Sequence, residues 1–205
     1  MKGTRPPNNA EIAAVSKSFE GTFAIRNRAL FMLGVSIGGR IDELLSLTVG
    51  DVYQNGKPVT DVLYDKSIVK GGETSRAVPL NADGRAAVAD IIAWHNEKAG
   101  LFESDKDTPL FVSRVKNTDG TPKRMTTQAG SDAIMAAFQR AGLICQACRL
   151  HFNGETLTDI AILIDVAPST LTRWKKTDIW KDFEAKLIDE WHQQTNENAT
   201  EKTRL

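Results

Sequence analysis

The chain contains 205 residues, of which 41% are hydrophobic and 25% charged, a composition typical of a globular protein that buries a core. Its 26 basic residues balance its 26 acidic residues, so no overall basic field indicates a nucleic acid or an anionic membrane as a partner. Two cysteines are too few for a secreted disulfide scaffold, and no window reaches the ~18 apolar residues of a membrane span. We therefore expect a cytoplasmic protein with no membrane partner, in which any DNA-binding surface is local.

The first part of the chain has the apolar spacing of helices. Asn8 or Asn9 can cap a first helix, which we expect to end at the pair Glu20-Gly21. A second helix is predicted over 24–36, where it stops at two consecutive glycines, and a short third helix follows at once. The order of these elements indicates a mainly helical beginning.

The pattern then changes to one that favours strands. β-Branched residues over 58–80 predict a small antiparallel sheet with a Gly-rich hairpin tip at 70–72. A helix is expected over 81–100, a polar loop over 115–123, and a further helix over 125–141.

Beyond Gly142 the apolar residues are spaced as three short helices, broken at Asn153-Gly154 and near Asp165. A last helix is predicted over 180–191. The polar residues that follow, 193–205, are expected to be disordered.

Three ordered segments resemble tyrosine recombinases, the phage integrase family. The sequence GGRIDELLSLTVGDV around Arg40 resembles the first catalytic motif of that family, and RNRALFMLGVSIGG resembles the helix that precedes it. The segment SIVKGGETSRAVPL resembles the family's β-hairpin with its lysine, here Lys70. The resemblance covers about residues 5–143 and implies an integrase-like catalytic core.

The resemblance also implies roles for individual residues. An arginine can hold two phosphate oxygens in a bidentate fork, and the family implies that Arg40 holds the scissile phosphate while Glu43 braces the motif. Lys70 has the place of a general acid toward the leaving 5′ oxygen. In the segment QACR, Arg149 takes the place of the family's second arginine, although the preceding histidine of the family's His-x-x-Arg box is absent.

The family's nucleophile is a tyrosine near the C-terminus, which forms a covalent phosphotyrosine link. This chain has two tyrosines, Tyr53 and Tyr64, and both precede Lys70. Neither matches the position of the nucleophile. We therefore expect no autonomous strand cleavage.

The segment CRLHFNGETLTDIAILIDVAPSTLTRWKKTDIW, which begins at Cys148, resembles the helix-turn-helix of phage terminase small subunits and transposase-like DNA binders. Thr156 with Asp159 forms a capping-box-like start, and Pro168 fits a first helical position. Leu171 and Trp174 are expected on the inward side. The recognition helix would place the following residues near phosphates or base edges: Ser169, Thr170, Thr172, Arg173, Lys175 and Lys176.

Two other interpretations of this region stay open. It could be a plain helical hairpin that closes the recombinase-like core. It could also be a decayed recombinase C-terminus, because TLTRW resembles the family's Thr-Thr-x-Arg-Tyr segment with Trp174 in place of the tyrosine.

Cys145, Cys148 and His151 are spaced i, i+3, i+6 and could in principle hold a metal ion. No fourth ligand is evident, and cysteines at helical spacing are more often small buried hydrophobes. We expect no metal and no cofactor.

The sequence thus predicts a mainly α fold with a small antiparallel β-sheet. It divides into an incomplete catalytic core at 1–143, a helix-turn-helix region at 144–192 and a tail at 193–205. The predicted function is that of a DNA-binding accessory or regulatory protein of a mobile element in integration or recombination. Double-stranded DNA is the expected partner, with a full-length recombinase or self-association beside it.

Two alternatives differ in class from that function. One is a site-specific recombinase or integrase that acts with a nucleophile supplied by a partner. The other is an interaction protein that modulates a full-length recombinase.

Overall fold

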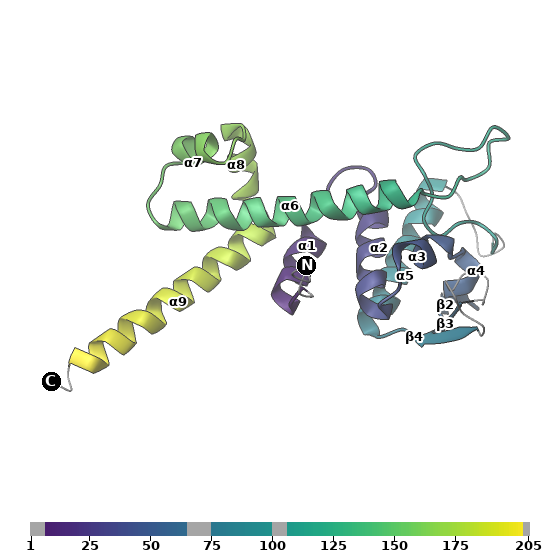
Figure 1. Cartoon of the computed structure of the whole chain (residues 1–205), viewed down its shortest axis with the longest axis horizontal. Helices are drawn as coiled ribbons and strands as arrows, with labels where there is room; N and C mark the ends of the chain where they lie inside the picture. The colour runs from purple at the N-terminus through teal and green to yellow at the C-terminus, as the bar shows by residue number, and fades with distance from the viewer. Residues whose placement is uncertain (1–6, 65–74, 100–105, 203–205) are drawn as a thin grey trace, which may run out of the picture. The chain divides into compact units, whose positions relative to one another are not determined.

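The computed structural model describes residues 7–64, 75–99 and 106–202 (Figure 1). The chain divides into two compact units. The core unit comprises Phe19–Ala136, and the terminal unit combines Met1–Ser18 with Ala137–Leu205. This grouping differs from the sequence-based boundary after residue 143, because the first 18 residues join the C-terminal part of the chain.

The helices of the core unit follow the expected order. They are α2 (Ala24–Ile37), α3 (Ile41–Ser46), α4 (Val49–Val52), α5 (Ala82–Ala99) and residues 127–136 of α6 (Thr127–Phe152). Gly38 ends α2 with a left-handed φ of 61°, and its N–H donates to the carbonyl of Gly34. Glycine adopts this conformation without steric cost. The predicted second helix and the helix predicted over 81–100 are confirmed to within one residue.

The strands form two hairpins instead of one small sheet. β1 (Tyr53–Gln54) pairs with β2 (Lys57–Pro58), and β3 (Asp61–Tyr64) pairs with β4 (Arg76–Pro79), both antiparallel. The first hairpin turns through Asn55 and Gly56, which both have positive φ. Asn-Gly is the preferred pair for such a turn, so the sequence carried this signal although the sheet was expected to begin at 58. The expected tip at 70–72 lies outside the described residues.

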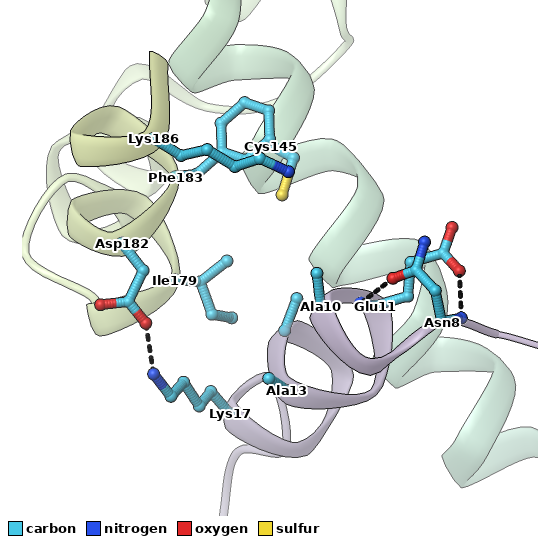
Figure 2. A pocket seen from close by; sticks show the side chains of 11 residues that line it. Asn8, Ala10, Glu11, Ala13, Lys17, Cys145, Ile179, Asp182, Phe183 and Lys186 are labelled. Atoms are coloured by element: carbon cyan, nitrogen blue, oxygen red, sulfur yellow. Dashed lines mark hydrogen bonds and ion pairs between the residues drawn. The ribbon is translucent and has the colours of Figure 1, made fainter. Parts of the chain in front are cut away.

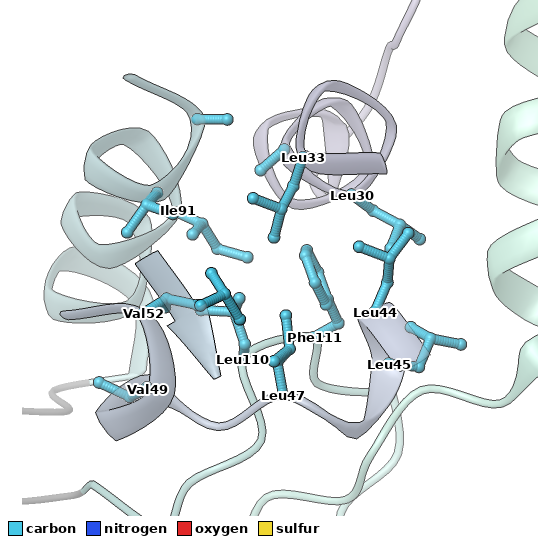
Figure 3. Close-up of a cluster of buried hydrophobic side chains, with 14 of the residues drawn as sticks. Leu30, Leu33, Leu44, Leu45, Leu47, Val49, Val52, Ile91, Leu110 and Phe111 are labelled. Carbon is cyan, nitrogen blue, oxygen red and sulfur yellow. The ribbon is translucent and has the colours of Figure 1, made fainter. Parts of the chain in front are cut away.

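Apolar side chains from α2, α3, α4, α5 and the segment 110–111 fill the interior of the core unit (Figure 3). Leu30, Leu33, Leu47, Ile91 and Phe111 are at most 1% exposed. Burying one such side chain contributes about 1.5–3 kcal/mol. This interior fixes the start of α3 and strand β3, which carry the residues discussed below.

The terminal unit is entirely helical in its described part. It contains α1 (Asn9–Lys17), residues 137–152 of α6, α7 (Leu157–Leu163), α8 (Pro168–Trp174) and α9 (Asp178–Lys202). Asn8 caps α1 in a reciprocal capping box with Glu11. The helix ends at Lys17, earlier than expected, because the buried hydroxyl of Ser18 donates to the carbonyls of Val15 and Ala137.

Two helices of the terminal unit are longer than predicted. α6 continues through Gly142 to Phe152, where the sequence suggested an end at 141. A single glycine costs a helix only about 1 kcal/mol, and burial of Ile144 and Cys148 just beyond it outweighs that cost. The tail expected to be disordered from 193 is instead helical as far as Lys202, because no glycine or proline interrupts α9.

A cavity of about 410 Å³ lies in the terminal unit, where α1 and α9 face each other beside α6 (Figure 2). Small side chains of α1 and the apolar residues Ile179 and Phe183 line it, and Lys17 forms an ion pair with Asp182 at one side. None of the helices in the described part of the chain combines the length and the apolar character that crossing a bilayer requires.

Candidate nucleic-acid interface

Arg40 occupies the N-cap position of α3, directly after the two glycines that end α2. Its main-chain N–H donates to Glu43 Oε2 at 3.0 Å, which fixes the start of the helix. Its side chain is 65% exposed, and Nη1 lies 3.6 Å from Glu43 Oε1. The guanidinium is therefore held at one edge and open to solvent on the other, as a phosphate-binding arginine must be.

Glu43 is the buried centre of this site, with a side chain only 5% exposed. A buried carboxylate is costly unless it is paired and hydrogen-bonded. Besides the N–H of Arg40, it accepts a hydrogen bond from Nη2 of Arg76 at 3.2 Å. The Arg76 guanidinium also lies over the ring of Tyr64, 5.4 Å from its centroid. Two arginines therefore share one carboxylate.

The two tyrosines of the chain differ in their burial. Tyr64 is fully buried, and its hydroxyl has no hydrogen-bond partner among the described residues. Burial, and then the charge of Glu43, raise the pKa of this phenol well above its ordinary value. Tyr53 is partly buried and packs against the same apolar core.

The family resemblance names two further residues, Lys70 and Arg149. Lys70 lies outside the described residues. Arg149 is exposed on α6 in the terminal unit, where its guanidinium lies 5.5 Å from the ring centroid of Phe183.

The predicted helix-turn-helix corresponds to α7 and α8, with a connection at 164–167. Thr156 caps α7 and accepts the N–H of Asp159, as the sequence predicted. Asp165 has a positive φ of 53° in the turn, and Pro168 occupies the first turn of α8. Leu171 and Trp174 are buried, which confirms the inward side of this helix.

The polar residues of α8 differ in their availability. Ser169, Thr172, Arg173 and Lys176 are exposed, whereas Thr170 and Lys175 are partly buried. The hydroxyl of Thr172 donates to the carbonyl of Pro168 at 3.2 Å. Among the described residues, no ion pair or hydrogen bond engages the side chains of Arg173 and Lys176, and both are exposed.

Lys175 has a partner that the sequence did not suggest. Its ammonium lies 2.9 Å from Nε2 of His151 at the end of α6, and Nδ1 of that histidine lies 3.2 Å from the carbonyl of Glu155. A neutral imidazole protonated on Nδ1 satisfies both contacts, because Nε2 then accepts from the ammonium.

The spacing of Cys145, Cys148 and His151 does not produce a metal site. Burial raises the pKa of Cys148 to about 12 and raises that of Cys145 as well. Both ring nitrogens of His151 are engaged as described. In the part of the chain that the structure describes, no three His, Cys, Asp or Glu side chains are arranged to hold a metal ion.

Sequence reasoning missed Arg76 and the role of His151. Arg76 stands in the hairpin segment that resembles the family, six residues after Lys70. The small sheet predicted over 58–80 includes it, but its pairing with Glu43, 33 residues earlier, depends on the tertiary fold.

A crystal structure of XerA recombinase is similar to the chain at 16% sequence identity, with a TM-score of 0.46, over 93% of this chain and 66% of that one. The chain therefore spans about two thirds of the length of that recombinase. No curated protein matches it significantly. Residues 7–155 match the Phage integrase family, and the chain belongs to this family of tyrosine recombinases.

Proposed function

We propose that this chain binds double-stranded DNA as an accessory or regulatory protein of a mobile element, in integration or recombination, without a tyrosine nucleophile of its own. Membership of the phage integrase family supports recombination as the process. One contrast carries the proposal. Arg40 is exposed and braced by Glu43, whereas Tyr64 is buried in the core and Tyr53 packs against it. A phosphate-binding group is retained and the nucleophile is not.

A second contact region in this proposal is the helix-turn-helix formed by α7 and α8. Arg173 and Lys176 are exposed cations that would neutralise phosphates, and Ser169 and Thr170 would approach base edges. Basic side chains on one short helix can do this in a protein with zero formal net charge, because phosphate contacts act locally. Lys70 and Arg149 are further proposed contacts to the DNA backbone.

The experiment that tests this function separates binding from cleavage. Binding of the full chain to a random duplex and to duplexes from element ends is measured by fluorescence anisotropy at several salt concentrations. The same chain is then incubated with nicked suicide substrates made from those ends, and the products are run on a denaturing gel. An active tyrosine recombinase with its own site serves as the positive control for covalent trapping.

We expect affinity that falls steeply with salt and no covalent protein–DNA band. Binding that does not depend on salt, or a band that survives denaturation, would contradict the proposal. A further reaction with a full-length recombinase added tests whether such a partner supplies the nucleophile. Cleavage that appears only in that mixture, and requires Arg40, would favour the alternative of a nucleophile supplied in trans.

A further inference from the structure

The carboxylate of Glu43 holds two guanidiniums rather than one. Arg40 approaches Oε1 and Arg76 approaches Oε2, at 3.6 Å and 3.2 Å. The two cations and one anion leave a net charge of +1 at a site where both arginines reach solvent, with side chains 65% and 45% exposed. One phosphodiester carries the charge that would neutralise this cluster.

The Arg76 guanidinium is oriented before any ligand binds. Glu43 accepts a hydrogen bond from one terminal nitrogen, and the guanidinium carbon lies over the ring of Tyr64. A guanidinium has five N–H donors. Among the described residues, Glu43 is the only acceptor of a hydrogen bond from the Arg76 guanidinium, through one of its nitrogens.

A second arginine pair in the same unit lacks this arrangement. Arg28 donates to Asp90 at 2.6 Å, and the two side chains are 44% and 48% exposed. There one cation meets one solvated anion and the local charge is zero. Such a surface pair contributes little and is screened by salt. Of these two groups, only the one around Glu43 has more cations than anions.

We propose that Arg76 is a second DNA-phosphate contact beside Arg40, so that the two arginines with Glu43 form one phosphodiester-binding cluster. The inference rests on the proposed DNA-binding function and extends it to a residue outside the three family-equivalent positions. Glu43 acts as a positioning residue in the cluster, because it touches both arginines and has almost no exposed surface.

The test compares the full chain with four single variants: Arg76→Gln, Arg76→Lys, Arg40→Gln and Arg28→Gln. The slope of log affinity against log salt is measured on a 30-base-pair duplex. Each lost phosphate contact reduces that slope by about 0.9. We expect this reduction in Arg76→Gln and in Arg40→Gln, a nearly normal slope in Arg76→Lys because the charge remains, and no change in the matched control Arg28→Gln.

The double variant Arg40→Gln/Arg76→Gln separates a direct contact from an indirect effect. If both arginines hold the phosphodiester, the double variant binds more weakly than Arg40→Gln at the same salt concentration, because a second direct contact is lost. If Arg76 acts only by supporting Arg40, the double variant has the affinity of Arg40→Gln alone, and the inference is wrong. Loss of slope in Arg40→Gln without loss in Arg76→Gln also refutes it and leaves the proposed function intact. No loss in either variant refutes both.

Removal of Arg76 leaves a buried carboxylate with fewer partners, so Arg76→Gln could unfold the core unit. Thermal melting of each variant detects this. In that event Glu43→Gln/Arg76→Gln is compared with Glu43→Gln, because both lack the buried charge and differ only at Arg76. A slope difference of about 0.9 between them supports the inference, and equal slopes overturn it.

Discussion

Replacing Arg173 and Lys176 together by alanine is expected to weaken the salt dependence of DNA binding without unfolding the terminal unit. Both side chains are exposed on or directly after α8. Lys175 is excluded from the variant because its ammonium already contacts His151. Solvent-facing charges usually contribute less than ~0.5 kcal/mol to folding, so the melting temperature should stay nearly unchanged.

The expected change in the salt dependence follows from the two cations that the variant removes. Two lost phosphate contacts lower the slope of log affinity against log salt by about 1.8. Between 50 and 200 mM salt, the affinity of the unaltered chain should then fall about twelvefold more than that of the variant. This difference corresponds to about 1.5 kcal/mol. Anisotropy titrations on one duplex at four or more salt concentrations resolve it.

The matched control removes the same charge from another helix. Lys181→Ala/Lys186→Ala takes two exposed lysines from α9 of the same unit. If the effect depends on position, the control keeps the normal slope. An equal reduction in both double variants would show that overall charge is responsible. An unchanged slope in Arg173→Ala/Lys176→Ala would refute the assignment of α8 as a phosphate-contacting helix.

The remaining expectations concern stability. Trp174→Ala should lower the free energy of unfolding by about 3–5 kcal/mol, because the side chain is only 5% exposed. The amides of α7 and α8 should then lose protection from hydrogen exchange. Retained protection would contradict the role of Trp174 as an apolar anchor. Gly142→Ala should raise the free energy of unfolding by about 0.5–1 kcal/mol, since nothing lies within 4 Å of the new Cβ. Gly84→Ala should lower the free energy of unfolding, because its Cβ would lie 2.3 Å from Ser36 Oγ. Urea unfolding measures the change in both glycine variants, and changes of the same sign would contradict the packing argument. Burial lowers the pKa of His95 below its ordinary value of 6.5, so the unfolded chain binds the proton more readily than the folded chain. The free energy of unfolding should therefore fall as pH decreases through about 6.5, by at most about 1.4 kcal/mol per pH unit. His95→Gln should flatten that pH dependence in denaturant titrations, and an unaltered dependence would assign it to other groups.

Local signals account for the elements that were predicted well. Gly38 ends α2 through a left-handed φ, Thr156 caps α7 with its hydroxyl, and Pro168 sits where its missing N–H costs nothing. Each of these effects acts within a few residues and is therefore visible in sequence. The position of Arg40 at a helix start was available for the same reason, because Glu43 lies one turn later.

Tertiary contacts account for what the sequence did not reveal. The hydrogen bond between Arg76 and Glu43 joins residues 33 apart, and the contact between Lys175 and His151 joins residues 24 apart. No periodicity encodes such pairs. The continuation of α6 past Gly142 likewise depends on burial of Ile144 and the residues after it, which propensity alone does not include.

The terminal unit is closed by the two ends of the described chain, as the ion pair between Lys17 and Asp182, 165 residues apart, illustrates. During synthesis, α1 is made before the core unit, and its partners on α9 are translated only after it. Closing so long a loop carries an entropic cost and slows assembly. Val15 is the only residue that α1 buries, so this helix exposes little apolar surface while its partner is still being made.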